Sequence, residues 1–119
     1  DDIPGLMTRQ PEKYRALKEM PPGANSIEWP IEQTRAAEAA ARIFWPLGNT
    51  RLERRLPLIK APTLIVWGEE DRLRPKSYAA TIARAIGAKT ESKIIGNAGH
   101  LAELDMPDEV AAAILRFMA

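Results

Sequence analysis

The 119-residue sequence contains no cysteine and only one histidine, His100. A chain without cysteine forms no disulfide, offers no thiol nucleophile and holds no cysteine-ligated metal, and nothing supports an oxidising compartment. A cytoplasmic location is therefore the default expectation.

The sequence also lacks a strong charge of one sign and a long apolar run. Its 17 Lys and Arg residues nearly balance its 16 Asp and Glu residues, which gives a formal net charge of +1. This balance argues against nucleic acid or an anionic membrane as the main partner. The longest apolar run is LIVW at 64–67, far below the roughly 20 residues of a membrane helix. The acidic first residues are unlike a signal peptide, so we expect a soluble protein.

The first fifty residues show helical patterns only. A short helix is predicted from Pro11 until the Pro21-Pro22-Gly23 stop, and a longer one runs from near Pro30 to Pro46. Glu38 precedes Arg42 by four residues, the spacing of an ion pair on a helix surface. One stripe of the longer helix is apolar and should pack on a core: Ala37, Ala41, Phe44 and Trp45.

The remaining sequence alternates between strand and helix patterns. The run around 63–67 is typical of a strand buried on both faces, and 91–96 predicts a second strand. A helix that begins at Pro75 and ends near Gly87 should separate the strands, with Tyr78, Ile82 and Ile86 on one face. A last helix from 106 should bury an apolar face formed by Val110, Ile114, Phe117 and Met118. This order predicts an α/β fold with parallel strands.

Two chemically useful side chains follow the two predicted strands. Asp71 comes soon after the first strand and His100 soon after the second, at the carboxyl edge where sites form in such sheets. Neighbouring strands lie about 4.8 Å apart, so the pair can reach hydrogen-bond distance. The carboxylate would then orient the imidazole, and the imidazole would carry protons. Glu69 and Glu70 are adjacent to Asp71 and remain alternative acids.

These residues resemble a known family. The stretches PTLIVWGEEDRLRP and IIGNAGHLAELDMPDEVAAAILRFM are similar to the carboxyl-terminal part of an α/β-hydrolase, over Leu56 to Ala119. The resemblance implies a partial α/β-hydrolase fold: a helical lid-like half at 1–50, then a core portion at 51–119 with two parallel strands, each followed by a helix. It identifies Asp71 as the acid and His100 as the base, with Gly68 and Gly99 as backbone positions beside them.

The sequence departs from that family in one respect. Such enzymes carry a nucleophile in a Gly-x-Ser-x-Gly elbow upstream of the acid and base, whereas the serines here are Ser26, Ser77 and Ser92, none of them flanked in this way. We therefore expect the carboxyl-terminal fragment of a cofactor-free enzyme that hydrolyses a small ester or lactone through an acyl-enzyme. The nucleophile could be serine or aspartate, and the fold also hosts dehalogenase, lyase and acyl-transfer chemistry. We expect the chain alone to be inactive, and to self-associate or bind the missing amino-terminal half.

Other interpretations stay open at this point. The chain could be a non-catalytic helical interaction module of hydrolase ancestry. The pattern His100-x-x-Glu103-x-Asp105 contains residue types that bind metal ions, but it includes only one histidine and no second motif supports a metal site. Aromatic side chains in the helical half could line an acyl pocket or simply form core: Tyr14, Trp29, Phe44 and Trp45. The basic RLERR stretch at 51–55 could meet an anionic substrate or be a solvated turn of helix.

Overall fold

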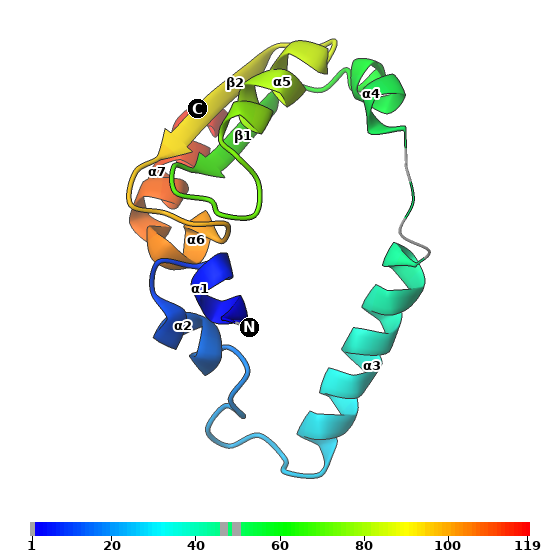
Figure 1. Cartoon of the computed structure of the whole chain (residues 1–119), viewed down its shortest axis with the longest axis vertical. Coiled ribbons are helices and arrows are strands. Elements are labelled where there is room, and N and C mark those ends of the chain that lie inside the picture. Colours follow the sequence, from blue (N-terminus) through cyan, green and yellow to red (C-terminus); the bar gives the residue numbers. More distant parts are fainter. Residues whose placement is uncertain (1, 46–47, 49–50) are drawn as a thin grey trace.

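A computed structural model describes residues 2–45, 48 and 51–119 of the chain (Figure 1). Its elements, in chain order, are α1 (Ile3–Met7), α2 (Pro11–Ala16), α3 (Glu28–Phe44), α4 (Leu52–Arg55), a 3-10 turn (Leu56–Leu58), β1 (Thr63–Gly68), α5 (Ser77–Ala85), β2 (Thr90–Ile95), α6 (Ala102–Asp105) and α7 (Pro107–Met118). Pro46, the predicted end of the longer helix, and the predicted boundary at residue 50 lie outside the described residues.

The two strands form a parallel sheet, as the sequence predicts. Their register runs from Thr63 opposite Thr90 to Gly68 opposite Ile95. The chain crosses from β1 to β2 through α5, and Figure 1 shows α5 in front of the strands and α7 behind them. Both helices contact both strands. The architecture is therefore an α/β arrangement of two strand-helix units, as the family resemblance implies.

The core is small and lies at the carboxyl end of the sheet. Its buried members are Ile95, Ala98, Ala102 and Val110, with Val66 and Met106 packed against them. The prediction that the first strand is buried on both faces was wrong, because only Gly68 of β1 is buried and residues 63–67 are half-buried. A sheet of two strands is too narrow for its helices to cover both faces of β1 completely.

The helices that flank the sheet bury less apolar surface than predicted. Val110 is buried, but Ile114 and Met118 are 42% and 76% exposed. Small residues contact the sheet instead, since Ala113 of α7 and Ala79 of α5 are buried. Tyr78, placed on the buried face of α5 by its spacing, is 49% exposed. The sheet is narrow, so only a thin stripe of each helix surface is buried against it.

Helix α3 has no buried residue. The predicted apolar stripe faces solvent, with Phe44 68% and Trp45 74% exposed, and Figure 1 shows α3 standing apart from the sheet. Local interactions support the helix: the predicted Glu38–Arg42 ion pair forms at 2.7 Å, and the Asn25 carboxamide oxygen accepts the first free backbone N–H groups. The predicted helix is therefore present, whereas the predicted packing of its apolar stripe on a core is absent from the described residues.

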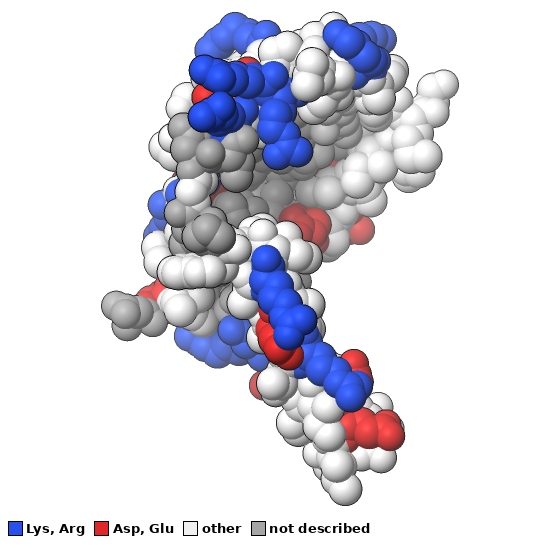
Figure 2. Space-filling model, turned by 90° about the vertical axis from the view of Figure 1, so that its right-hand side faces the viewer, with Lys and Arg blue, Asp and Glu red and all other residues white. Residues whose placement is uncertain are grey.

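The basic stretch at 51–55 forms the exposed helix α4. Arg54 and Arg55 lie in its last turn, and Figure 2 shows Lys and Arg side chains gathered at the level that α4 occupies in Figure 1. This agrees with a solvated turn of helix. Among the helices that the structure describes, none combines the length and the apolar character needed to cross a membrane.

Candidate active site

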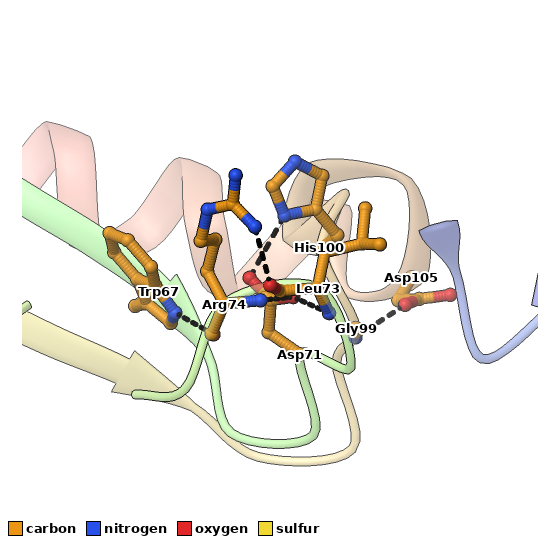
Figure 3. A network of polar contacts seen from close by, with 7 residues as sticks. All are labelled: Trp67, Asp71, Leu73, Arg74, Gly99, His100 and Asp105. Carbon is orange, nitrogen blue, oxygen red and sulfur yellow. Dashed lines mark hydrogen bonds and ion pairs between the residues drawn. The ribbon is translucent and has the colours of Figure 1, made fainter. Parts of the chain in front are cut away.

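Asp71 and His100 meet at the carboxyl edge of the sheet. Asp71 lies three residues beyond the end of β1, and His100 lies five residues beyond the end of β2. The Nδ1 atom of His100 is 2.9 Å from Oδ2 of Asp71 (Figure 3). The predicted contact across the ends of two parallel strands is therefore confirmed.

The Asp71 carboxyl group is enclosed by its own loop. Its side chain is 3% exposed, and Oδ1 accepts hydrogen bonds from the backbone N–H groups of Leu73 and Arg74, at 2.8 and 2.9 Å. Burial raises its pKa, but the hydrogen bond with His100, the Arg74 and Leu73 N–H groups and the His100 charge outweigh burial and hold the pKa below its usual value. Asp71 is therefore ionised at neutral pH. An ionised carboxylate only accepts hydrogen bonds, so Nδ1 of His100 carries the proton between them.

The His100 ring remains accessible on its other side. Its side chain is 35% exposed, and its second ring nitrogen points away from Asp71 in Figure 3. A pocket of about 220 Å³ lies beside the pair, lined by Val66, Trp67, Gly68, Asp71 and His100. Because Nδ1 is held by Asp71, Nε2 is the nitrogen free to accept a proton.

Close backbone contacts hold the two loops together. The N–H groups of Glu69 and Glu70 donate to the carbonyl groups of Ile95 and Ala98, at 2.8 and 2.9 Å. A methyl group on Gly68 would overlap the carbonyl oxygens of Gly99 and Ala98, so only glycine fits where β1 passes the His100 loop. Gly68 and Gly99, the glycines that the resemblance places beside the acid and the base, are thus in close backbone contact.

The neighbouring carboxylates are engaged elsewhere. Glu69 pairs with Lys76 at 2.7 Å, and this hydrogen bond and charge lower the pKa of Glu69. Glu70 pairs with Arg9 at 2.6 Å. Of the three adjacent acids, Asp71 is the one that bonds His100.

Asp105 and Glu103 do not join the imidazole to form a metal-type cluster. The Asp105 carboxylate accepts the backbone N–H of Gly99 at 2.7 Å (Figure 3), and Glu103 is exposed. Within residues 2–45, 48 and 51–119, no group of three or more His, Asp or Glu side chains is placed to hold a metal ion.

The pocket beside His100 contains one aromatic side chain that sequence reasoning missed. Trp67 lines it, and the indole N–H donates to the carbonyl oxygen of Arg74 at 3.1 Å, which braces the Asp71 loop. The sequence feature that could have indicated this role is the position of Trp67, which is the last residue before Gly68 at the carboxyl end of the predicted strand. The aromatic residues considered from the sequence lie elsewhere, since that pocket is lined by none of Tyr14, Trp29, Phe44 and Trp45.

None of the three serine hydroxyl groups, all within the described residues, is hydrogen-bonded to Asp71 or His100. Ser26 is in the turn before α3, Ser77 begins α5 and Ser92 is in β2. Ser92 stands three residues before the carboxyl end of its strand, which is about 10 Å along it. No hydroxyl group in the described part of the chain is hydrogen-bonded to His100.

Comparison with known families gives a match over nearly the whole chain. The sequence model described as the alpha/beta hydrolase family matches residues 3–113. The match therefore begins well before Leu56 and includes the helices α1 to α3. The residue patterns of these helices resemble the family less clearly than those of the last 64 residues.

Individual relatives match as well. Monoacylglycerol lipase ABHD6 of Homo sapiens is 32% identical over 68 residues, 57% of this chain and 20% of the lipase. A thermophilic esterase from Thermogutta terrifontis has a TM-score of 0.53 and 30% identity over 56% of this chain and 24% of the esterase. A membrane phospholipase A, described as a bacterial virulence factor, has a TM-score of 0.57 and 30% identity over 97% of this chain and 39% of the phospholipase. The chain thus spans between a fifth and two fifths of the length of these relatives.

Proposed function

The chain belongs to the alpha/beta hydrolase family, and from this premise we propose that it supplies the acid and the base of an ester-hydrolysing active site. The observation that carries the proposal is the 2.9 Å contact between Nδ1 of His100 and Oδ2 of Asp71. A buried, ionised carboxylate behind an accessible imidazole is the arrangement that proton transfer to and from a nucleophile requires.

In the proposed mechanism, Asp71 fixes the tautomer and orientation of His100. The Nε2 atom of His100 takes the proton from a nucleophile as that nucleophile attacks the ester carbonyl, and then passes the proton to the departing alcohol. A water molecule, activated by the same nitrogen, cleaves the acyl-enzyme and releases the acid. The reaction needs no cofactor.

We propose that the nucleophile and the oxyanion-stabilising donors come from another polypeptide segment. None of the described serines, Ser26, Ser77 and Ser92, is hydrogen-bonded to His100, so we propose that a serine on an elbow outside these 119 residues completes the triad and gives its proton to Nε2. An aspartate at that position would attack as a carboxylate with no proton to give, and His100 would then act only on the hydrolytic water. The names of the lipase, the esterase and the phospholipase all describe ester hydrolysis, and we propose a small carboxylic ester as substrate. The absence of cysteine favours a cytoplasmic enzyme.

A non-catalytic interaction module is the second candidate function. The observation that favours it is the exposed apolar surface of α3 and its end, where Ile43, Phe44 and Trp45 are 77%, 68% and 74% exposed. Such a surface suits partner binding. In this case the Asp71–His100 contact would be inherited from a hydrolase ancestor and would have no catalytic role.

A chimera distinguishes the two functions. The segment of the Thermogutta terrifontis esterase that this chain matches, 24% of the esterase, would be replaced by the matching residues of this chain, and hydrolysis of an activated ester measured. We expect turnover that His100→Ala and Asp71→Asn each lower by on the order of 10³ to 10⁴. Glu69→Gln, which removes the neighbouring carboxylate bonded to Lys76, is the matched control and should keep most of the activity. Equal turnover with histidine or alanine at position 100 would favour the interaction module.

A further inference from the structure

Asp105 is a buried carboxylate that no cation neutralises among the described residues. It ends α6 and is 2% exposed. Its oxygens accept three backbone N–H groups: Gly99 at 2.7 Å, Arg9 at 2.9 Å and Gln10 at 3.2 Å. Burying a charge costs free energy unless such donors compensate for lost water, so this carboxylate is held in place by the segments that it joins.

One of those segments is the loop that carries His100. Gly99 directly precedes His100, and its N–H makes the shortest of the Asp105 contacts. A methyl group on Gly99 would approach Oδ2 of Asp105 and the Cα atom of Thr8 within 3.3 and 3.2 Å. Asp105 therefore holds the Ala98–Gly99 peptide group, one peptide before His100.

The other segment lies more than ninety residues earlier in the chain. Residues 7–10 pass beside the His100 loop, where the carbonyl oxygen of Met7 accepts the N–H of Leu101 at 2.8 Å. The Gln10 side-chain amide also donates to the Asp105 carbonyl oxygen at 3.1 Å. Arg9 reaches onward to Glu70, next to Asp71, at 2.6 Å. The segment thus contacts both loops of the acid–base pair, and Asp105 is its anchor.

We propose that Asp105 is a positioning residue for His100: by holding Gly99 against residues 9 and 10, it keeps Nδ1 of His100 directed at Asp71. Its importance for turnover rests on the function proposed above, whereas its effect on the imidazole is a property of this chain alone. Asp105 acts through the peptide backbone, and its own carboxylate does not bond the ring.

The single histidine permits a direct test in the chain itself. A long-range ¹H–¹⁵N correlation spectrum of the neutral ring reports how the proton is shared between Nδ1 and Nε2, and every imidazole signal belongs to His100. Asp71→Asn, which removes the ionised acceptor, provides the reference for an uncoupled ring. In the wild-type chain we expect the Nδ1–H form to exceed its fraction in this reference.

Asp105→Asn and Asp105→Ser remove the carboxyl group that accepts the Gly99 N–H and should move the tautomer ratio of the ring toward that of the Asp71→Asn reference. We expect the ratio of Nδ1–H to Nε2–H to fall about fivefold, the factor for losing a hydrogen bond worth about 1 kcal/mol. Asp105→Glu keeps a carboxylate and should recover part of the ratio. Glu103→Gln, an exposed acid of the same helix, is the matched control and should leave the ratio unchanged.

Two results would overturn the proposal. Folded Asp105→Asn or Asp105→Ser chains with the wild-type tautomer ratio would show that Asp105 only anchors the amino-terminal segment. Loss of folding in every Asp105 variant, next to a cooperatively folded Glu103→Gln chain, would likewise assign Asp105 a purely structural role. Because the readout does not involve turnover, neither result depends on whether the chimera is active.

Discussion

At the residue scale, Gly68 links the sheet to the acid–base pair. A side chain at this position would overlap the carbonyl oxygens of Gly99 and Ala98, which are backbone atoms and cannot rotate away. Gly68→Ala must therefore push the His100 loop off the end of β1. We expect the free energy of unfolding to fall by about 1 to 3 kcal/mol or more, the range for overpacking a tight site.

Gly96→Ala is the matched control for this prediction. Gly96 follows β2 in the same loop, and a methyl group there would meet only the Glu69 side chain, at an ordinary 3.8 Å. Urea unfolding of both variants provides the measurement. Equal stability of Gly68→Ala and Gly96→Ala would show that the two loops tolerate separation and that Gly68 does not hold them together.

The residues of the site differ in how far the sequence could predict them. Asp71 and His100 could be placed because each follows a strand at short range, and neighbouring parallel strands bring such positions together. The contacts of Asp105 could not be predicted in the same way, since Arg9 and Gln10 are 96 and 95 positions away from it. Local patterns contain no information about that pairing.

At the element scale, periodicity predicted which segments are helical better than it predicted what they contact. The stripe on α3 has the right spacing for a buried face, yet none of its residues is buried. The four-residue spacing on α7 likewise put Ile114 and Met118 inside, although both are exposed. A pattern states which side of a helix would pack, whereas burial also requires a surface to pack against.

Strand β1 leaves one edge unpaired, because the described sheet contains two strands only. The N–H groups of Thr63 and Glu69 point to the β2 side, so by alternation those of Leu64 and Val66 point to the open edge. Unpaired strand edges beside exposed apolar side chains favour association. We expect the isolated chain to form a dimer or larger oligomer at low micromolar concentration, by strand addition or by exchange of its helical half.

Light scattering during size-exclusion chromatography measures this association. Leu64→Pro removes an outward N–H without removing a β1–β2 hydrogen bond, and we expect it to shift the distribution toward monomer if the edge is the interface. An unchanged oligomer would instead favour exchange of the helical half. A stable wild-type monomer with a cooperative unfolding transition would contradict the prediction of self-association.

At the scale of the whole molecule, the chain combines a well-formed acid–base pair with a narrow sheet and a small core. It spans 20% of the human lipase and 24% of the thermophilic esterase that it resembles, and the family model matches residues 3–113, which include both strands. The family and the parallel α/β arrangement could be predicted from the last 64 residues because each motif there lies within one strand-helix unit. The placement of the helical half could not, since nothing in its own sequence specifies its partner surface.

The central claim is that Asp71 and His100 act in hydrolysis and need a nucleophile from outside these residues. Hydrolysis of an activated ester by the isolated chain, assayed beside the esterase chimera, tests it most directly. We predict that the isolated chain is indistinguishable from its His100→Ala variant, because the proposed mechanism takes its nucleophile and oxyanion hole from outside these residues, whereas the chimera turns over only with histidine at position 100. Turnover by the isolated chain that His100→Ala abolishes, or a chimera that works equally well with alanine there, would contradict the account.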